Sequence, residues 1–129
     1  MNPVKIVLIE DDRVLSDAIY GGLKDAGFEV DRAFDGESGL DMVFEKKPAL
    51  VLLDIIMPKM NGLSVAKKLK SNPETKNIPV IILTVLEKTE AVAEALDIGV
   101  NEYFLKSDFK VEDIVKKVQE NLKRQGKVL

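Results

Sequence analysis

Short apolar runs alternate with amphipathic stretches along most of the chain. Residues 6–9, 50–53 and 80–83 are continuously apolar and contain many β-branched side chains, as expected of strands buried on both faces of a parallel sheet. Residues 28–33 alternate apolar and polar positions, which is typical of an edge strand. The shorter run 102–105 is expected at the opposite edge. The pattern therefore predicts five strands.

Apolar residues between the strands recur with the spacing of one helix face. The spacing is clearest over residues 15–26, and Gly27 follows there as a helix stop signal. The same spacing recurs over residues 92–99 and 111–122, and shorter, less regular helix patterns cover residues 37–45 and 62–71. Because strand and helix alternate five times, we expect an α/β fold with a parallel sheet and right-handed crossovers. In such a sheet, functional residues collect at the carboxyl ends of the strands.

Composition narrows the chemistry that this fold can carry. The 129 residues suffice for one domain, which we place at residues 1–123, followed by a solvated tail at 124–129. No apolar run approaches the roughly 18 residues of a membrane helix, and a net charge of −3 argues against nucleic acid as the main partner. The absence of cysteine and histidine excludes thiol and Ser-His nucleophiles and metal sites built on those residues. Carboxylates, hydroxyls, lysine and a hard metal ion remain.

Acidic residues follow two of the predicted strands. Glu10, Asp11 and Asp12 come directly after the first strand, and Asp54 ends the third. An acid in this place commonly caps the next helix, and for Asp12 that interpretation carries as much weight as a functional one. Three adjacent carboxylates repel one another, however, and a bound cation relieves the repulsion. If the first and third strands are neighbours, Asp54 completes an oxygen-lined site suited to Mg²⁺, with Mn²⁺ as the alternative.

A hydroxyl and an ammonium group are expected at the same edge of the sheet. Thr84 ends the fourth strand and Lys106 the fifth. Taken singly, such a threonine is usually structural and such a lysine is a solvated charge. Together with a metal and a carboxylate, they are the groups that phosphoryl transfer needs, because the cations neutralise phosphoryl oxygens while the carboxylate attacks. The product of that attack would be an aspartyl phosphate at Asp54.

In their order along the chain, these motifs resemble the receiver domain of two-component response regulators. The matching segments are Glu10-Asp11-Asp12, residues 35–40, residues 54–62, Ile78-Pro79, Thr84 and residues 99–106. The resemblance implies a three-layer, flavodoxin-like (βα)5 fold whose doubly wound parallel five-stranded sheet has the strand order 2-1-3-4-5. It also implies a cytoplasmic signalling protein rather than an enzyme, a receiver that assists only its own phosphorylation and dephosphorylation.

The resemblance further implies which residues bind metal and phosphate. Asp54 accepts a phosphoryl group from a phosphohistidine on a partner protein. Asp11, Asp54 and the backbone carbonyl of Ile56 are direct Mg²⁺ ligands, and Glu10 acts through water. The lack of histidine in this chain fits a receiver whose donor lies on another protein.

Thr84 and Lys106 are implied to hold phosphoryl oxygens, and Tyr103 to turn inward once Thr84 is drawn to the phosphate. From its own pattern, Tyr103 is an ordinary edge-strand side chain. The implied partners are a histidine kinase or phosphotransfer protein and a downstream protein that contacts the fourth helix, fifth strand and fifth helix. No membrane or direct nucleic-acid contact is implied, and the expected state is a monomer or a weak phosphorylation-dependent dimer.

Two residues depart from the family's usual pattern. Ser107 stands where a proline commonly follows the lysine, and we expect Ser107 or Asp108 to cap the last helix while Lys106 still reaches the site. Val85 stands where a small residue is usual, so its β-branched side chain could crowd the phosphoryl site. These departures keep one competing hypothesis open, a receiver-like interaction module that no longer accepts phosphate.

Two other functions suit the same fold less well. A flavodoxin-like FMN binder needs free N–H groups and small residues after the first strand, where this chain has acids. A Mg²⁺-dependent phosphatase with an aspartate nucleophile normally carries two aspartates one residue apart at that place, but position 10 is glutamate.

Overall fold

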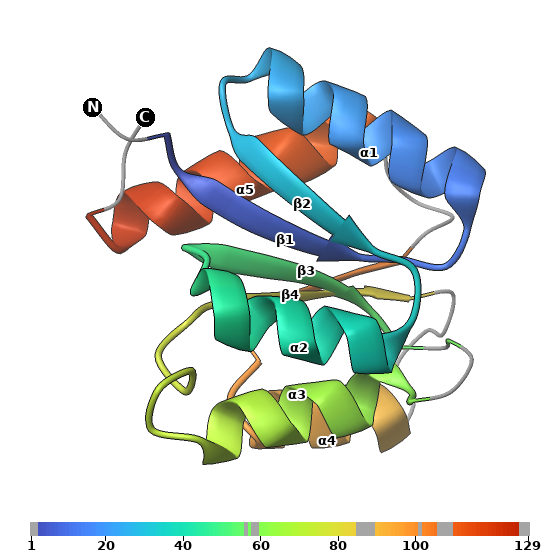
Figure 1. Cartoon of the computed structure of the whole chain (residues 1–129), viewed down its shortest axis with the longest axis vertical. Helices are drawn as coiled ribbons and strands as arrows, with labels where there is room; N and C mark the ends of the chain where they lie inside the picture. The colour runs from blue at the N-terminus through green and yellow to red at the C-terminus, as the bar shows by residue number, and fades with distance from the viewer. Residues whose placement is uncertain are drawn as a thin grey trace.

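The computed structural model describes residues 3–55, 57, 60–84, 90–100, 102–105 and 110–126 (Figure 1). Strands and helices alternate through these residues. Their bounds are β1 Lys5–Ile9, α1 Arg13–Asp25, β2 Glu29–Ala33, α2 Gly36–Lys46, β3 Leu50–Asp54, α3 Gly62–Ser71, β4 Val80–Thr84, α4 Glu90–Asp97, β5 Glu102–Leu105 and α5 Val111–Arg124. None of the helices in the described ranges combines the length and the apolar character needed to cross a bilayer.

The strands form one parallel sheet in the order β2-β1-β3-β4-β5, which confirms the predicted fold. The interior strand β1 pairs with β2 on one side and with β3 on the other, so that Ile9 lies opposite both Ala33 and Leu53. β2 and β5 are the edges, as their sequences indicate. All carboxyl ends therefore point to the same side of the sheet.

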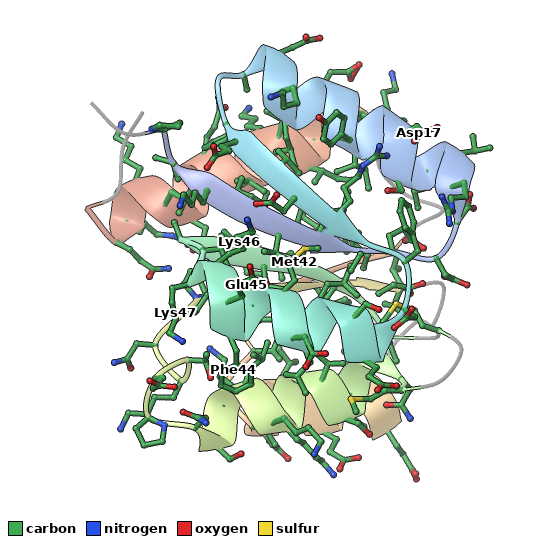
Figure 2. All side chains as sticks on the ribbon, in the orientation of Figure 1. Asp17, Met42, Phe44, Glu45, Lys46 and Lys47 are labelled. Atoms are coloured by element: carbon green, nitrogen blue, oxygen red, sulfur yellow. The ribbon has the colours of Figure 1, made fainter. Side chains whose placement is uncertain are left out.

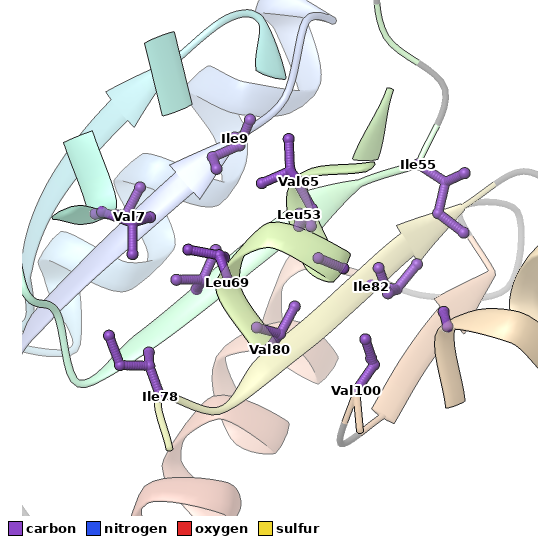
Figure 3. Close-up of a cluster of buried hydrophobic side chains, with 14 of the residues drawn as sticks. Val7, Ile9, Leu53, Ile55, Val65, Leu69, Ile78, Val80, Ile82 and Val100 are labelled. Atoms are coloured by element: carbon purple, nitrogen blue, oxygen red, sulfur yellow. The ribbon is translucent and has the colours of Figure 1, made fainter. Parts of the chain in front are cut away.

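Two hydrophobic cores lie on opposite faces of the sheet. The first core lies under α2, α3 and α4, and it is built around side chains such as Leu53, Leu69 and Ile82 (Figure 3). The second core lies under α1 and α5 and includes Leu52 and Leu83. Successive residues of a strand point to opposite faces, so the continuously apolar strands supply both cores. Each fully buried Leu or Ile contributes about 1.5–3 kcal/mol to stability.

Polar side chains fix where three of the helices begin. The side chains of Asp12, Asp35 and Asn61 each accept a hydrogen bond from the backbone N–H three residues on, at 3.1, 2.8 and 2.9 Å. These N-caps satisfy backbone donors that a helix leaves unpaired. At the other end of α1, Gly27 has a φ of 98°, which confirms the predicted stop. Each N-cap stands at the carboxyl edge of the sheet, where function was expected.

The predicted cap of the last helix is wrong. α5 begins at Val111 with Lys110 as its N-cap, and the carboxylate of Asp113 accepts a hydrogen bond from the Lys110 N–H at 3.1 Å. Ser107 and Asp108 lie outside the described residues. The Asp113 carboxylate lies at the positive end of the helix dipole and binds the N–H of the N-cap residue, which is the half of a capping box that the third helical residue supplies.

Charged side chains cover the outer surfaces of the helices. Asp17 on α1 and Glu45 near the end of α2, for example, are exposed and point away from the cores (Figure 2). The Asp17 carboxylate also accepts a hydrogen bond from Arg32 of β2 at 2.6 Å. The guanidinium of Arg32 lies 4.2 Å from the ring centroid of Tyr20, so α1 shields the sheet edge formed by β2.

Candidate functional site

Three carboxylates converge at the carboxyl ends of β1 and β3. Glu10 and Asp11 follow β1 directly, and Asp54 is the last residue of β3. Because Ile9 and Leu53 are paired in the parallel ladder, the next residue on each strand emerges at the same level. One oxygen from each of Glu10, Asp11 and Asp54 lies within 4.8 Å of the other two. We call these three residues the acid triad.

The triad is partly buried and held by the backbone. Glu10 is fully buried and Asp54 is 3% exposed, whereas Asp11 is open to solvent. The Glu10 N–H donates to the Ala33 carbonyl at 3.1 Å, and its Oε2 accepts from the Asp12 N–H at 3.0 Å. These bonds orient the Glu10 carboxylate before any ligand binds.

Asp12 has a different function from its neighbours. Its Oδ1 accepts from the Leu15 N–H at 3.1 Å, and its carbonyl accepts from the Ser16 N–H at 2.8 Å. The side chain therefore caps α1, which was the structural interpretation of this residue. Within the described residues, the grouping of close carboxylates contains Asp11 and leaves out Asp12.

The donor set of the triad fits a hard divalent cation. Carboxylate oxygens are the ligands that Mg²⁺ and Mn²⁺ prefer, and such ions usually retain several waters. Two of the three carboxylates are buried, so the repulsion between them is weakly screened by solvent. A cation at this place would offset that repulsion, and the exposed Asp11 leaves the site open to water.

Thr84 and Tyr103 lie on the two strands next to the triad. Leu83 of β4 is paired with Asp54, and Thr84, fully buried, is the next residue toward the carboxyl edge. Tyr103 of β5 is paired with Ile82 and packs, half-buried, against the first core. Ile82 and Thr84 are two residues apart, so Thr84 and Tyr103 share the sheet face covered by α3 and α4.

Besides Ser107 and Asp108, three residues of the sequence analysis are not placed. Ile56, Val85 and Lys106 lie outside the described residues, so their predicted roles remain predictions.

Comparison with known proteins agrees with this geometry. The family profile described as the response regulator receiver domain matches residues 6–119. The chain belongs to this family. The receiver domain from Methanospirillum hungatei, described as CheY-like, has a TM-score of 0.90 at 25% identity and covers 98% of both chains. A response regulator receiver domain from Francisella has a TM-score of 0.85 at 30% identity, over 96% of this chain and 99% of its own.

The receiver domain is also similar to the amino-acid sequences of longer response regulators. It is 32% identical over 124 residues to the DNA-binding dual master transcriptional regulator RpaA of Synechocystis, covering 96% of this chain and 51% of that one. It is 35% identical over 117 residues to the transcriptional regulatory protein DltR of Streptococcus agalactiae, covering 90% and 50%. The chain thus spans about half the length of the curated relatives it matches. Its family places it among the signalling domains of two-component systems.

Two close contacts around the site could not be read from the sequence. The Gly62 N–H donates to the Ile55 carbonyl at 2.7 Å, and a Cβ on Gly62 would lie 2.0 Å from the Asp54 carbonyl oxygen. A Cβ on Gly36 would lie 2.0 Å from the carbonyl oxygen of Met60. The one available signal was the position of each glycine, directly after a residue that caps a helix.

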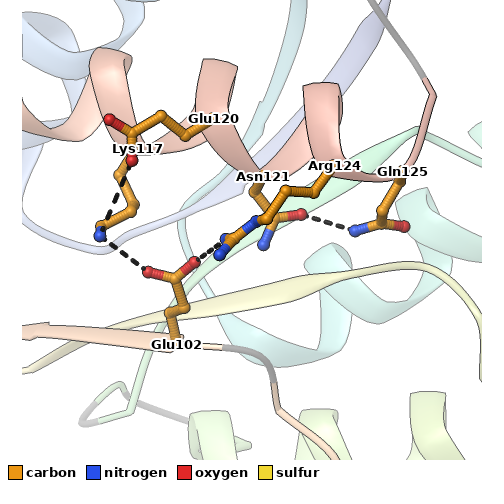
Figure 4. A network of polar contacts seen from close by, with 6 residues as sticks. All are labelled: Glu102, Lys117, Glu120, Asn121, Arg124 and Gln125. Carbon is orange, nitrogen blue, oxygen red and sulfur yellow. Dashed lines mark hydrogen bonds and ion pairs between the residues drawn. The ribbon is translucent and has the colours of Figure 1, made fainter.

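A polar network at the opposite end of β5 was also not anticipated. Glu102 contacts Lys117 and Arg124 of α5, with the Lys117 Nζ 3.3 Å from the carboxylate (Figure 4). Burial alone raises the pKa of Glu102, but the hydrogen bonds from Arg124 and Lys117 outweigh it and hold that pKa below its ordinary value. Arg124 is thus part of α5 and ties the helix to the edge strand.

Proposed function

We propose that this receiver domain is a Mg²⁺-dependent phosphoacceptor, and that Asp54 takes the phosphoryl group from a phosphohistidine of a histidine kinase or phosphotransfer protein in the cytoplasm. The observation that carries the proposal is the convergence of the acid triad, whose oxygens lie within 4.8 Å of one another. A capping role accounts for Asp12 alone and leaves the three converging carboxylates unexplained.

Asp11, Asp54 and the backbone carbonyl of Ile56 would hold Mg²⁺, and Glu10 would act through a water molecule. When bound, the ion supplies positive charge that offsets the carboxylates and the phosphoryl oxygens. The buried position of Glu10 and its hydrogen bond from the Asp12 N–H support a fixed orientation for its carboxylate.

In the transfer step, a carboxylate oxygen of Asp54 attacks the phosphorus atom. The new O–P bond forms while the P–N bond of the phosphohistidine breaks, and the electron pair of that bond stays on the imidazole nitrogen. The Thr84 hydroxyl would donate a hydrogen bond to one phosphoryl oxygen, and the Lys106 ammonium would bind another. Val14, 81% exposed at the start of α1, offers the donor protein an apolar contact beside the site.

Phosphorylation then changes the surface that a downstream partner meets. The phosphoryl group adds negative charge and new acceptor oxygens next to Thr84. If Thr84 is drawn toward it, space opens on the face where Tyr103 packs, and α4, β5 and α5 change their exposed surface. Moving such an equilibrium from mostly inactive to mostly active takes about 5.5 kcal/mol of differential interaction.

Intact-mass measurement tests the proposal. The protein is incubated with Mg²⁺ and a small acyl phosphate, and a phosphoryl adduct is expected that is absent in EDTA and in Asp54→Asn. Asp41→Asn, the same change at an exposed position on α2, is the matched control and should keep the adduct. If the wild-type protein forms no adduct and shows no Mg²⁺ affinity, the domain is instead an interaction module that no longer accepts phosphate.

A further inference from the structure

Gly36 occupies a fixed and crowded position at the start of α2. Its neighbour Asp35 caps the helix by accepting from the Ser38 N–H at 2.8 Å, so the backbone here cannot shift without losing that bond. Gly36 is buried. A Cβ at this residue would lie 2.0 Å from the carbonyl oxygen of Met60 and 3.0 Å from a methyl carbon of Val65.

The atom closest to Gly36 belongs to the backbone of Met60, so it cannot easily move aside for a side chain. A crowded side chain can rotate away, whereas a carbonyl oxygen moves only with its chain segment. Met60 belongs to the connection between β3 and α3, which leaves the sheet at Asp54. Any side chain at residue 36 would therefore push on the segment that follows Asp54.

A short path of contacts links Met60 to Asp54. Asn61, the next residue, caps α3 by accepting from the Ser64 N–H at 2.9 Å. Gly62 follows and packs against the end of β3, where its N–H donates to the Ile55 carbonyl at 2.7 Å. A displacement of Met60 is thus carried to the backbone that holds Asp54.

We propose that Gly36 is a positioning residue of the phosphoacceptor site: its lack of a side chain lets the Met60 carbonyl pack against α2, and this contact, acting through Gly62, sets where Asp54 lies relative to Glu10 and Asp11. The inference rests on the proposed function and deepens it. It gives a role to the Asp35-Gly36 motif, which neither binds metal nor accepts phosphate in that proposal.

Three alanine variants separate positioning from simple crowding. Gly36→Ala places a methyl group on the Met60 carbonyl. Gly22→Ala is the crowded control, because its Cβ would lie 2.5 Å from a side-chain carbon of Val111, at the α1–α5 contact. Gly21→Ala is the uncrowded control, with nothing within 4 Å of the new Cβ.

For each variant, the Mg²⁺ affinity of the unphosphorylated protein is measured by calorimetric titration, and the thermal midpoint is measured separately in EDTA. We expect Gly36→Ala to weaken Mg²⁺ binding about 10-fold or more, the range seen when residues that orient metal ligands are changed. Gly22→Ala should lower the midpoint in EDTA and keep the wild-type Mg²⁺ affinity. Gly21→Ala should keep the wild-type Mg²⁺ affinity and raise the midpoint in EDTA, because alanine favours a helix interior more than glycine does.

Two results would overturn the inference: unchanged Mg²⁺ affinity in Gly36→Ala, or an equal loss in Gly22→Ala. If the wild-type protein binds no Mg²⁺ and accepts no phosphoryl group, the proposed function itself has failed. If Gly36→Ala does not fold, an amide NMR titration of the wild-type protein with Mg²⁺ decides. The amide signals of Gly36 and Met60 should then shift at the same Mg²⁺ concentration as the amide signal of Asp54. Signals that do not move at Gly36 and Met60 contradict the inference.

Discussion

Replacing Asp54 with asparagine tests whether the buried carboxylates of the acid triad repel one another in the metal-free domain. Glu10 and Asp54 are at least 97% buried, and their nearest triad oxygens lie within 4.8 Å. At that separation and an effective dielectric constant of about 20, two unit charges repel by roughly 3.5 kcal/mol. Asparagine has nearly the shape of aspartate, so the substitution removes the charge and leaves the packing in place.

The increase in the free energy of unfolding will be smaller than this Coulomb energy, because the asparagine side chain accepts weaker hydrogen bonds than a carboxylate does. We expect Asp54→Asn to raise the free energy of unfolding in EDTA by about 1–2 kcal/mol, which in a domain of this size is roughly 4–8 °C in the thermal midpoint. Mg²⁺ at 100 times its dissociation constant should stabilise the wild-type protein by about 2.7 kcal/mol and the variant by much less.

Urea unfolding in EDTA and in Mg²⁺ measures both effects. Asp41→Asn makes the same chemical change at an exposed position and should alter stability by no more than about 0.5 kcal/mol in either condition. The reasoning is refuted if Asp54→Asn is less stable than the wild-type protein in EDTA, or if Mg²⁺ stabilises the two proteins equally.

Two further predictions concern β5. The folded-state pKa of Glu102 lies below its unfolded value, so the stabilisation from Arg124 and Lys117 is present at neutral pH and is lost as the pH falls through the range below about 4.3. Glu102→Gln should therefore lower the free energy of unfolding by up to about 1 kcal/mol at pH 7 and leave it unchanged near pH 2. Urea titrations at the two pH values measure this, and an equal difference at both would contradict it. The chain has two tyrosines, and Tyr20 belongs to α1 with its ring against Arg32 of β2. On phosphorylation, the ring NMR signals of Tyr103 should shift while those of Tyr20 stay in place. A fixed Tyr103 signal would contradict its role in the switch.

The fold could be predicted largely because its signals are local. The strands with apolar residues on both faces, such as residues 50–53, belong in the middle of a parallel sheet, and the helix-stop signal of Gly27 depends only on its own backbone. The convergence of Glu10 with Asp54 followed from topology, since neighbouring parallel strands end at one edge. A Mg²⁺ site and an aspartyl phosphate at Asp54 were inferred from the residue types, and the detailed ligand set came from the family resemblance; these roles are proposals.

What the sequence did not disclose depends on contacts between distant residues. Gly36 and Met60 come into contact only in the folded domain, and their residue types do not indicate that contact. Arg124 was expected in a solvated tail because its neighbours in the sequence are polar. Its ion-pair partner, Glu102, lies on β5. The start of α5 was misjudged because serine and aspartate are common caps, whereas here Asp113 supplies the carboxylate from inside the helix.

The division of the interior into two separate cores has a consequence for how such a domain diversifies. Side chains under α1 and α5 do not share a packing layer with those under α3 and α4, because the sheet stands between them. Surface residues of α1 can therefore be exchanged for those of a homologue without repacking the opposite layer. Chimeras that graft α1 from another receiver should fold with the original α2, α3 and α4, whereas the contact between α1 and α5 needs matching residues on both helices.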